Sequence, residues 1–380
     1  MNTTTAKKPR LLYIDNLRIL LTILVIMHHF AIGYGGPGGF WYWEDGPMSD
    51  ISEILMTLML AINQAFFMGF FFMLSSYFSP GSIDRKGAGS FLIDRLKRLG
   101  LPLLLYLLVL TPLMSYGAER VRGSSVTLWE QLALYYSSIV HFGVAQMWFL
   151  AALLAFASVY VIWRRLAKPM PDSEEAAPGN AAIAVFALAL GVVTFVVRIW
   201  LSVGWEIPIV NWQIPHFPQY IALYILGIVA YRRNWFEAVT DAQGKTWLFV
   251  VIGLVVMFPV LFIAGGALEG VLDPYFGGLH WQSFVYSVWE QFMCMGMVIT
   301  LLTWFRRRFT EQSGLTKTMS GAAYATYVFH VPIIFLVALA LRSIRLDMGL
   351  KYVLVVPFAV AAAFLVGYII KKLPVARNIF

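Results

Sequence analysis

Residues 13–34, YIDNLRILLTILVIMHHFAIGY, form an apolar stretch that also carries ionisable side chains. A membrane-spanning helix needs about 20 mainly apolar residues, and the stretch is that long although it contains Asp15, Arg18, His28 and His29. Ionisable residues inside a bilayer are costly, so they usually face a protein interior or a cavity and mark function. The stretch therefore predicts a transmembrane helix with a functional polar stripe.

Helical spacing indicates which of these side chains lie together. At about 100° per residue, the steps from Arg18 to His29 make three turns plus roughly 20°. Arg18 and His29 therefore share one face, about 16 Å apart along the axis. Asp15 falls within roughly 40° of His29, whereas His28 points about 100° away from it. We expect a carboxylate and a guanidinium near one membrane surface, with an imidazole about three turns deeper.

The composition of the whole chain is typical of a polytopic membrane protein. Of its 380 residues, 60% are hydrophobic and 13% are charged, and apolar segments recur without a long polar block. We predict an all-α transmembrane helical bundle of about ten spans that forms a single membrane domain (1–380), with a basic cytoplasmic tail at residues 1–12. The predicted spans are 14–34, 51–78, 99–117, 144–163, 181–203, 218–231, 246–264, 281–304, 321–342 and 349–370.

Lys and Arg are unevenly distributed between the two sides of this bundle. Of the 28, 21 lie in the two tails and the even-numbered connections, five lie in the odd-numbered connections, and Arg18 and Arg198 lie within spans. Positive residues concentrate in cytoplasmic loops, so both termini are expected in the cytoplasm. We expect no cleavage of the tail, because no A-x-A-like site follows it. The net charge of +8 thus indicates topology rather than nucleic-acid binding.

His29 is the strongest candidate for a catalytic residue. A neutral imidazole costs less to bury than a charge, and it can take a proton from a hydroxyl. The structural alternative is a histidine that is hydrogen-bonded between helices, but the stripe shared with Arg18 and Asp15 favours function. We expect no metal site, because His28 and His29 diverge and no third ligand is evident.

Arg95 and Arg98 lie just before the third span, on the expected cytoplasmic side. They are three residues apart and share a helix face. Such a pair can bind phosphates in bidentate fashion. Taken alone, however, the two residues are also explained by anchoring to anionic lipid.

Polar and aromatic side chains in later spans are candidates for substrate binding. Tyr327 and His330 are three residues apart in YATYVFHVPIIF, so they lie on one face of the ninth span. Trp148 begins the fourth span. Glu290 and Arg198 lie within the eighth and fifth spans, where they either pair with each other or contact a polar substrate.

The order of these motifs resembles that of the acyltransferase-3 family of membrane-bound O-acyltransferases. Arg18 and His29, separated by ten residues, are similar to its R-x10-H signature, and the segment from Arg95 to Arg98 is similar to its R-x-x-R. The segment YATYVFHVP resembles its Y-S-x-Y-L-x-H-x-P.

Two further segments resemble the family but depart from it at one position each. FFMLSSYF is similar to F-F-x-x-S-G-F, with Ser76 in the glycine position, and QMWFL is similar to H-L-W-F-L, with Gln146 in place of His. Within the family, the sequence resembles most the branch that includes periplasmic-glucan succinyltransferases.

The resemblance implies transfer of an acyl group, acetyl or succinyl, from cytoplasmic acyl-CoA to a hydroxyl of a carbohydrate or other acceptor beyond the membrane. Acyl-CoA is then a co-substrate, and no tightly bound cofactor is expected. The expected partners are these two substrates and membrane lipid, without nucleic acid, and the expected location is the bacterial inner membrane.

The resemblance also implies roles for the candidate residues. Arg95 and Arg98 would hold the CoA phosphates. His29 would act as general base or accept the acyl group itself, and Arg18, oriented by Asp15, would position the donor or offset developing negative charge. The alternative function is a transporter or flippase with a buried His/Arg/Glu relay, which the lack of an internal repeat disfavours.

Overall fold

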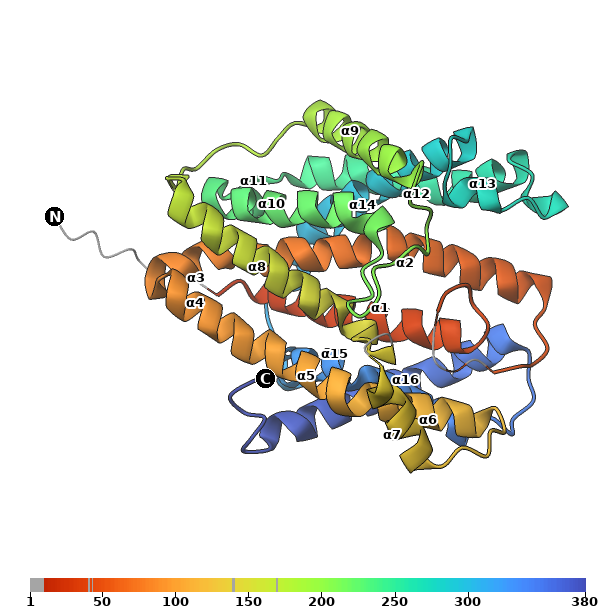
Figure 1. Cartoon of the computed structure of the whole chain (residues 1–380). Coiled ribbons are helices and arrows are strands. Elements are labelled where there is room, and N and C mark those ends of the chain that lie inside the picture. Colours follow the sequence, from red (N-terminus) through yellow and green to blue (C-terminus); the bar gives the residue numbers. More distant parts are fainter. Residues whose placement is uncertain (1–9, 40–41, 43, 139–140, 169) are drawn as a thin grey trace.

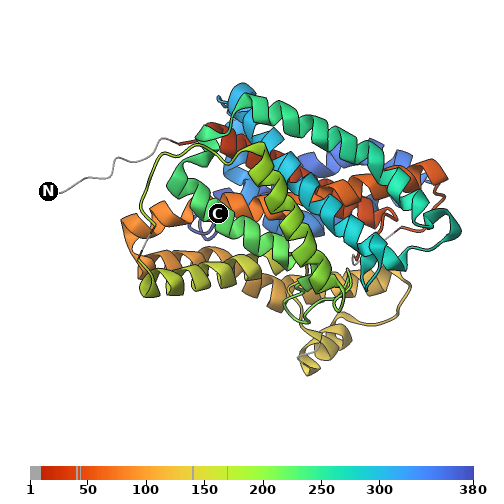
Figure 2. The same ribbon diagram turned by 90° about the horizontal axis from the view of Figure 1, so that it is seen from above.

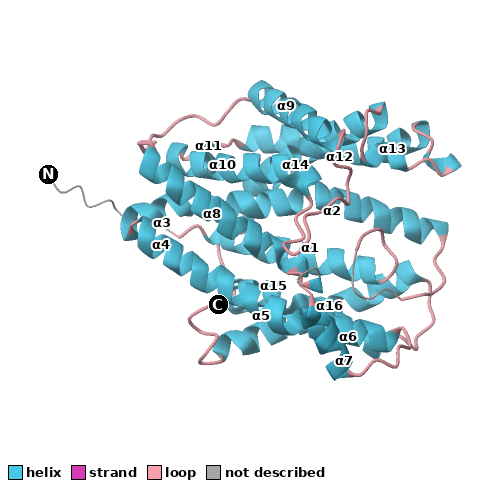
Figure 3. Ribbon diagram, in the orientation of Figure 1, coloured by secondary structure: helices cyan, strands magenta, loops and turns pink. Residues whose placement is uncertain are grey.

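The computed structural model describes residues 10–39, 42, 44–138, 141–168 and 170–380, and these ranges form helices joined by loops, without a β-strand (Figures 1 and 3). Ten helices are long and apolar enough to cross a membrane. The all-α fold with ten spans predicted from the sequence is therefore confirmed. Most of the predicted tail, residues 1–9, lies outside the described ranges.

Eight of the ten spans are helices that run through a bilayer length without a break. They are α1 (Leu12–Gly33), α8 (Trp148–Leu166), α9 (Asn180–Arg198), α10 (Phe217–Arg233), α12 (Asp241–Ala264), α14 (Trp281–Arg308), α15 (Gly314–Ala340) and α16 (Met348–Lys372). The second span is α2 (Asp50–Tyr77), which continues into α3 (Ser79–Lys86). Short helices in the connections include α7 (Leu128–Ser137), α11 (Trp235–Ala238) and α13 (Asp273–Phe276).

The third span is longer and less regular than the predicted 99–117. It comprises α4 (Ala88–Arg95), α5 (Leu101–Leu105) and α6 (Thr111–Val121), joined by the π-helical segments η1 (Leu96–Gly100) and η2 (Tyr106–Leu110). Pro102 and Pro112 stand in the first turns of α5 and α6. A proline has no N–H to donate to the preceding turn, so the helix opens locally into a wider turn. The span begins earlier than predicted because the basic stretch before residue 99 is also helical.

Helix α1 lies in the middle of the bundle (Figure 1) and contacts α2, α14, α15 and α16. Within its most apolar window, 67% of the residues are buried, compared with 17% for α12, which is therefore peripheral. Figures 1 and 2 show α8 beside α4, and these two helices cover one side of the bundle. The helix with the polar stripe is thus enclosed by other spans, as the cost of burying ionisable groups in lipid requires.

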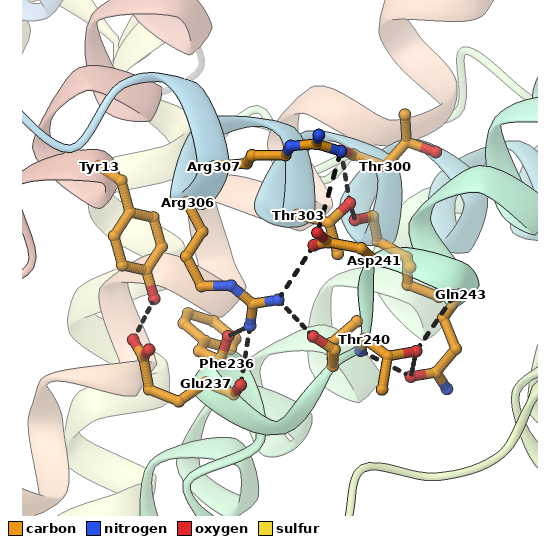
Figure 4. Close-up of polar contacts among 12 residues, drawn as sticks. Tyr13, Phe236, Glu237, Thr240, Asp241, Gln243, Thr300, Thr303, Arg306 and Arg307 are labelled. Carbon is orange, nitrogen blue, oxygen red and sulfur yellow. Dashed lines mark hydrogen bonds and ion pairs between the residues drawn. The ribbon is translucent and has the colours of Figure 1, made fainter.

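Both ends of the described chain lie at one end of the bundle, because Arg10 and Phe380 line the same cavity. We call this end the terminal face. A polar cluster fixes α1, α11 and α14 to one another there (Figure 4). The Tyr13 hydroxyl donates to Glu237 Oε1 at 2.8 Å, and Arg306 Nη1 donates to the carbonyl oxygens of Phe236 and Glu237, each at 2.8 Å.

Helices α2 and α10 approach each other closely at Gly227. A Cβ atom added to this glycine would lie 2.3 Å from the Met73 carbonyl oxygen and 2.1 Å from Ser76 Oγ. We predict that Gly227→Ala lowers the melting temperature of the purified protein, with a loss of about 1–3 kcal/mol, as is usual for overpacking. The matched control is Gly253→Ala on α12, where nothing lies within 4 Å, and Ala is the better helix former. Equal melting temperatures for the two variants would contradict the prediction.

The Lys and Arg distribution generates a prediction about orientation. Reporter fusions should place the terminal face in the cytoplasm and residues 44–49, at the opposite end, outside it. Fusions after Arg165 and after Phe380 test the first expectation, and an insertion after Asp45 tests the second. If a reporter that works only outside the cytoplasm is active when fused to the C-terminus, this orientation is wrong.

Candidate functional site

A cavity of about 1600 Å³ extends from the terminal face into the bundle. We call it the inner cavity. Arg10 and Phe380 lie at its rim, and the lining residues farthest along α1 and α15 are Thr22 and Tyr327. Parts of α1, α2, α3, α4, α8, α10, α11, α14, α15 and α16 form its walls. A cavity of this size can admit a large elongated molecule from the terminal face.

The lining of the inner cavity carries more positive than negative side chains. Such a lining attracts anions and favours phosphate groups in particular. The basic residues are Arg10, Arg18, Arg85, Lys86, Arg95, Arg98, Arg232, Arg306 and Lys371, and the acidic residues are Asp15, Asp94, Asp172, Glu174 and Glu237. Sequence reasoning identified three of these basic residues as site residues. It interpreted Arg232, Arg306 and Lys371 as topological charges, because nothing in their spacing shows that they meet across helices.

Arg18 lies in the wall of the inner cavity and is held by α1 itself. Its Nη1 lies 3.3 Å from Asp15 Oδ1, and Asp15 Oδ2 accepts from Arg10 Nε at 2.7 Å. The guanidinium carbon lies 4.8 Å from the ring centre of Phe78. The Arg18 side chain remains 37% exposed. Its position is therefore fixed, while its N–H groups stay accessible to a ligand in the cavity.

Arg95 and Arg98 line the same cavity, from the junction of α4 and η1. Arg95 Nη2 donates to Ser79 Oγ at 3.4 Å, and its guanidinium lies 5.0 Å from the Phe91 ring centre. The Arg98 guanidinium lies 5.9 Å from the ring centre of Tyr324. Lys97, between the two arginines, is exposed and is not among the lining residues. The two arginines of the R-x-x-R motif are thus the ones that face the cavity.

His29 lies beyond the inner cavity, in contact with His330. The His29 Nδ1 and His330 Nε2 atoms are 3.1 Å apart, and the two ring centres are 5.0 Å apart. Along α15, His330 is three residues past Tyr327, a rise of about 4.5 Å. Along α1, His29 is seven residues past Thr22, about 10 Å. Sequence spacing placed these histidines on two separate spans and did not predict that they meet.

The hydrogen bonds of this pair determine which nitrogens carry protons. A carbonyl oxygen can only accept, so His330 Nδ1, 2.6 Å from the Tyr327 carbonyl oxygen, is protonated. By the same argument, His29 Nδ1 carries a proton, because it lies 3.0 Å from the Val25 carbonyl oxygen. The His330 Nε2 atom of a neutral ring then accepts from His29 Nδ1–H. In the neutral His29 ring the basic lone pair therefore resides on Nε2.

His28 has a different environment from His29. Its ring centre is 5.0 Å from that of Phe67, and the residue is 9% exposed. Among the described residues, His28 Nδ1 has no hydrogen-bond partner. His28 is thus packed against α2, whereas His29 is hydrogen-bonded towards α15.

The remaining candidates for substrate binding lie apart from the inner cavity. Arg198 Nη1 is 2.5 Å from Glu290 Oε2, and its Nη2 is 3.3 Å from His216 Nδ1. The side chains of Arg198 and Glu290 are 0% and 2% exposed. Trp148 stacks on Tyr220 with ring centres 5.4 Å apart. The structure therefore shows Arg198 and Glu290 paired with each other, and their role in substrate binding stays a prediction.

The comparisons with known proteins agree with one another. The model of the acyltransferase domain of the acyltransferase-3 family matches residues 11–372. Proteins named glucans biosynthesis protein C are similar over nearly the whole chain. Those from Escherichia coli strains K12 and SMS-3-5 are each 22% identical over 379 residues, which cover 97% of this chain and 93% of the relative.

A third relative, from Escherichia coli O1:K1 / APEC, is 22% identical over 380 residues with the same coverage. No solved structure matches significantly. The family match extends over more than nine-tenths of the chain and includes both histidines, the Arg18 stripe and the R-x-x-R arginines. This chain therefore belongs to the acyltransferase-3 family.

Proposed function

We propose that this membrane acyltransferase transfers an acyl group from cytoplasmic acyl-CoA to a hydroxyl of an acceptor beyond the membrane. The observation that carries the proposal is the hydrogen-bonded pair of His29 and His330 next to the inner end of a basic cavity. In this proposal the chain is a single domain of the bacterial inner membrane, and the terminal face is cytoplasmic. The basic residues of that face serve CoA and anionic lipid rather than nucleic acid.

The inner cavity is the proposed donor site. The phosphates of CoA bind Arg95 and Arg98 near the rim, because a guanidinium matches phosphate oxygens in bidentate fashion. The long, flexible arm of CoA then runs past Arg18 towards Tyr327. Arg18, fixed by Asp15, positions the donor and offsets negative charge that develops on the thioester oxygen.

His29 is the proposed general base. Its Nε2 takes the proton of the acceptor hydroxyl while the hydroxyl oxygen attacks the thioester carbonyl carbon. The new C–O bond forms, the C–S bond breaks, and the CoA sulfur leaves with the proton that His29 returns. His330 acts as a positioning residue, since it accepts the Nδ1–H of His29 and stabilises the imidazolium. An acyl-histidine intermediate would use the same nitrogen.

The acyl group is proposed to be acetyl or succinyl, and the acceptor a carbohydrate. The names of the relatives, glucans biosynthesis protein C, support a carbohydrate acceptor. The alternative function, a transporter or flippase with a buried relay, predicts no acyl-dependent release of CoA. Release of CoA thiol by the purified protein supplied with acetyl- or succinyl-CoA therefore distinguishes the two functions.

The two neighbouring histidines generate the first functional prediction. His29→Ala should lower the transfer rate by about 10²–10⁴, the usual contribution of a positioned acid–base group. His28→Ala, which removes ring contacts with Phe67 and His29 but no hydrogen bond of the histidine pair, should lower it by less than about tenfold. The measurement is CoA release by each purified variant, with acyl-CoA affinity as a control for folding. An inactive His28→Ala together with an active His29→Ala would refute the assignment of the base.

The R-x-x-R arginines generate the second functional prediction. Arg95→Ala or Arg98→Ala should weaken acyl-CoA binding by about 1–3 kcal/mol through lost charge-assisted contacts. Lys97→Ala is the matched control, because it removes a neighbouring charge that does not line the cavity. High salt should reduce the difference between variants and wild type. If Lys97→Ala weakens acyl-CoA binding as much as Arg95→Ala or Arg98→Ala does, the two arginines act only through the general positive charge of the surface.

A further inference from the structure

A second cavity, of about 400 Å³, lies at the end of the bundle opposite the terminal face. We call it the outer cavity. Its lining comes from the loop that follows α1, the end of α6 and the segment that follows α15. Its volume is within the usual range for small-ligand sites. Its lining residues are Tyr42, Glu44, Asp45, Ala118, Val121, Arg122, Arg342 and Arg345.

Three guanidinium groups dominate the polar lining of the outer cavity. Arg122 Nη1 is paired with Glu119 at 2.8 Å, and Arg345 Nη1 donates to the Asp45 carbonyl oxygen at 3.1 Å. Arg342 is exposed, and its guanidinium has no hydrogen bond or ion pair within the part of the chain that the structure describes. At least one guanidinium is therefore available for a ligand.

The carboxylate of Glu44 does not offset these charges. Its Oε1 is 2.5 Å from Lys351 Nζ, and the two side chains are 5% and 1% exposed. A buried pair of this kind neutralises its own charges. Asp45 then remains as the one acidic lining residue that lacks an ion pair among the described residues. The lining of the outer cavity is therefore positive overall, because its guanidinium groups outnumber the carboxylate of Asp45.

The outer cavity lies close to the histidine pair on both of the helices that carry it. The Tyr42 ring is 5.6 Å from that of Phe335, five residues past His330, a rise of about 7.5 Å. The backbone N–H of Glu44 donates to the Gly33 carbonyl oxygen at 2.9 Å. Gly33 is four residues past His29, about 6 Å along α1. The two histidines thus lie between the inner and outer cavities.

We propose that the outer cavity binds the acceptor through an anionic group, a carboxylate or a phosphate, on a polyhydroxylated molecule. This inference rests on the proposed function and names the class of acceptor. Guanidinium groups match carboxylate and phosphate oxygens geometrically and carry no acceptor for a neutral sugar hydroxyl. With the anionic group held by Arg342, a hydroxyl several ångströms away reaches the histidine pair.

An anionic lipid headgroup offers the same chemistry as an anionic acceptor. The test therefore uses purified protein in phosphatidylcholine nanodiscs, with and without phosphatidylglycerol. The probes are glucuronate, glucose 6-phosphate and glucose, and the readout is the dissociation constant from calorimetric titration. Because binding is measured without acyl-CoA, this test does not depend on turnover.

We expect glucuronate or glucose 6-phosphate to bind at least about tenfold more tightly than glucose, as charge-assisted hydrogen bonds imply. Arg342→Ala should remove this preference. Arg120→Ala is the matched control and should keep it, because Arg120 lies at the same end of α6, outside the cavity lining. Equal binding of glucose and the anionic probes, or an unchanged preference in Arg342→Ala, would overturn the inference.

The comparison of nanodiscs with and without phosphatidylglycerol distinguishes an anionic acceptor from an anionic lipid headgroup. If phosphatidylglycerol abolishes binding of the anionic probes to the wild type, the outer cavity is a lipid site and the inference is wrong. If probe binding persists, the acceptor assignment is supported. CoA release by the wild type tests the proposed function separately, so its failure is distinguishable from a failure of the outer cavity to prefer anions.

Discussion

The constraint on which this structure depends is that polar groups inside a bilayer must find their partners within the protein. Helix α1 shows how the constraint is met. Its polar groups form hydrogen bonds with three neighbours. The Leu24 carbonyl oxygen accepts from Asn63 of α2, the Met27 carbonyl oxygen accepts from Tyr352 of α16, and His29 donates to His330 of α15. These bonds fix the rotation of α1 in the bundle, and with it the direction of His29.

Aromatic side chains surround the inner end of the inner cavity. Phe71, Phe149 and Tyr327 form a mutual contact at the inner end of the inner cavity, with ring centres 5.8–6.5 Å apart. His330 follows directly, with its ring 5.8 Å from that of Tyr327. These aromatic side chains therefore lie between the inner cavity and the histidine pair. In the proposed reaction, such an aromatic layer would limit the access of water to the acyl donor and so favour transfer to a bound hydroxyl over hydrolysis.

The number of spans was predictable from the sequence, since each span needs its own apolar run and Lys and Arg mark the connections. The stripe of Asp15, Arg18 and His29 was also predictable, because it depends only on the period of one helix. The irregular backbone of the third span was not predictable. Its π-helical turns follow from two prolines, and a hydropathy pattern does not show the effect of a proline on the preceding turn. Contacts between segments far apart in the sequence could not be predicted either. The His29–His330 bond spans 301 residues.

The buried pair of Glu44 and Lys351 at the outer cavity is a second contact that the sequence did not predict. The sequence placed both residues in connections or at a helix start, where charges are normally solvated, and assigned Lys351 only a topological role. In the structure the loop after α1 folds back over α16, so both side chains lose contact with water. Burial of a loop residue depends on where the loop packs, which single-sequence patterns do not report.

The interrupted third span contributes lining residues to both cavities, and its π turns affect how the span tolerates changes in length. Its first part, with Arg95 and Arg98, lines the inner cavity, and its last part, with Ala118 and Val121, lines the outer cavity. In a regular α-helix, an inserted residue rotates everything beyond it by about 100°. A π turn absorbs one additional residue locally, so the two parts of this span are not locked in a common phase. An insertion or deletion in one part of the span can thus be absorbed at a π turn, while the part that lines the opposite cavity keeps its orientation.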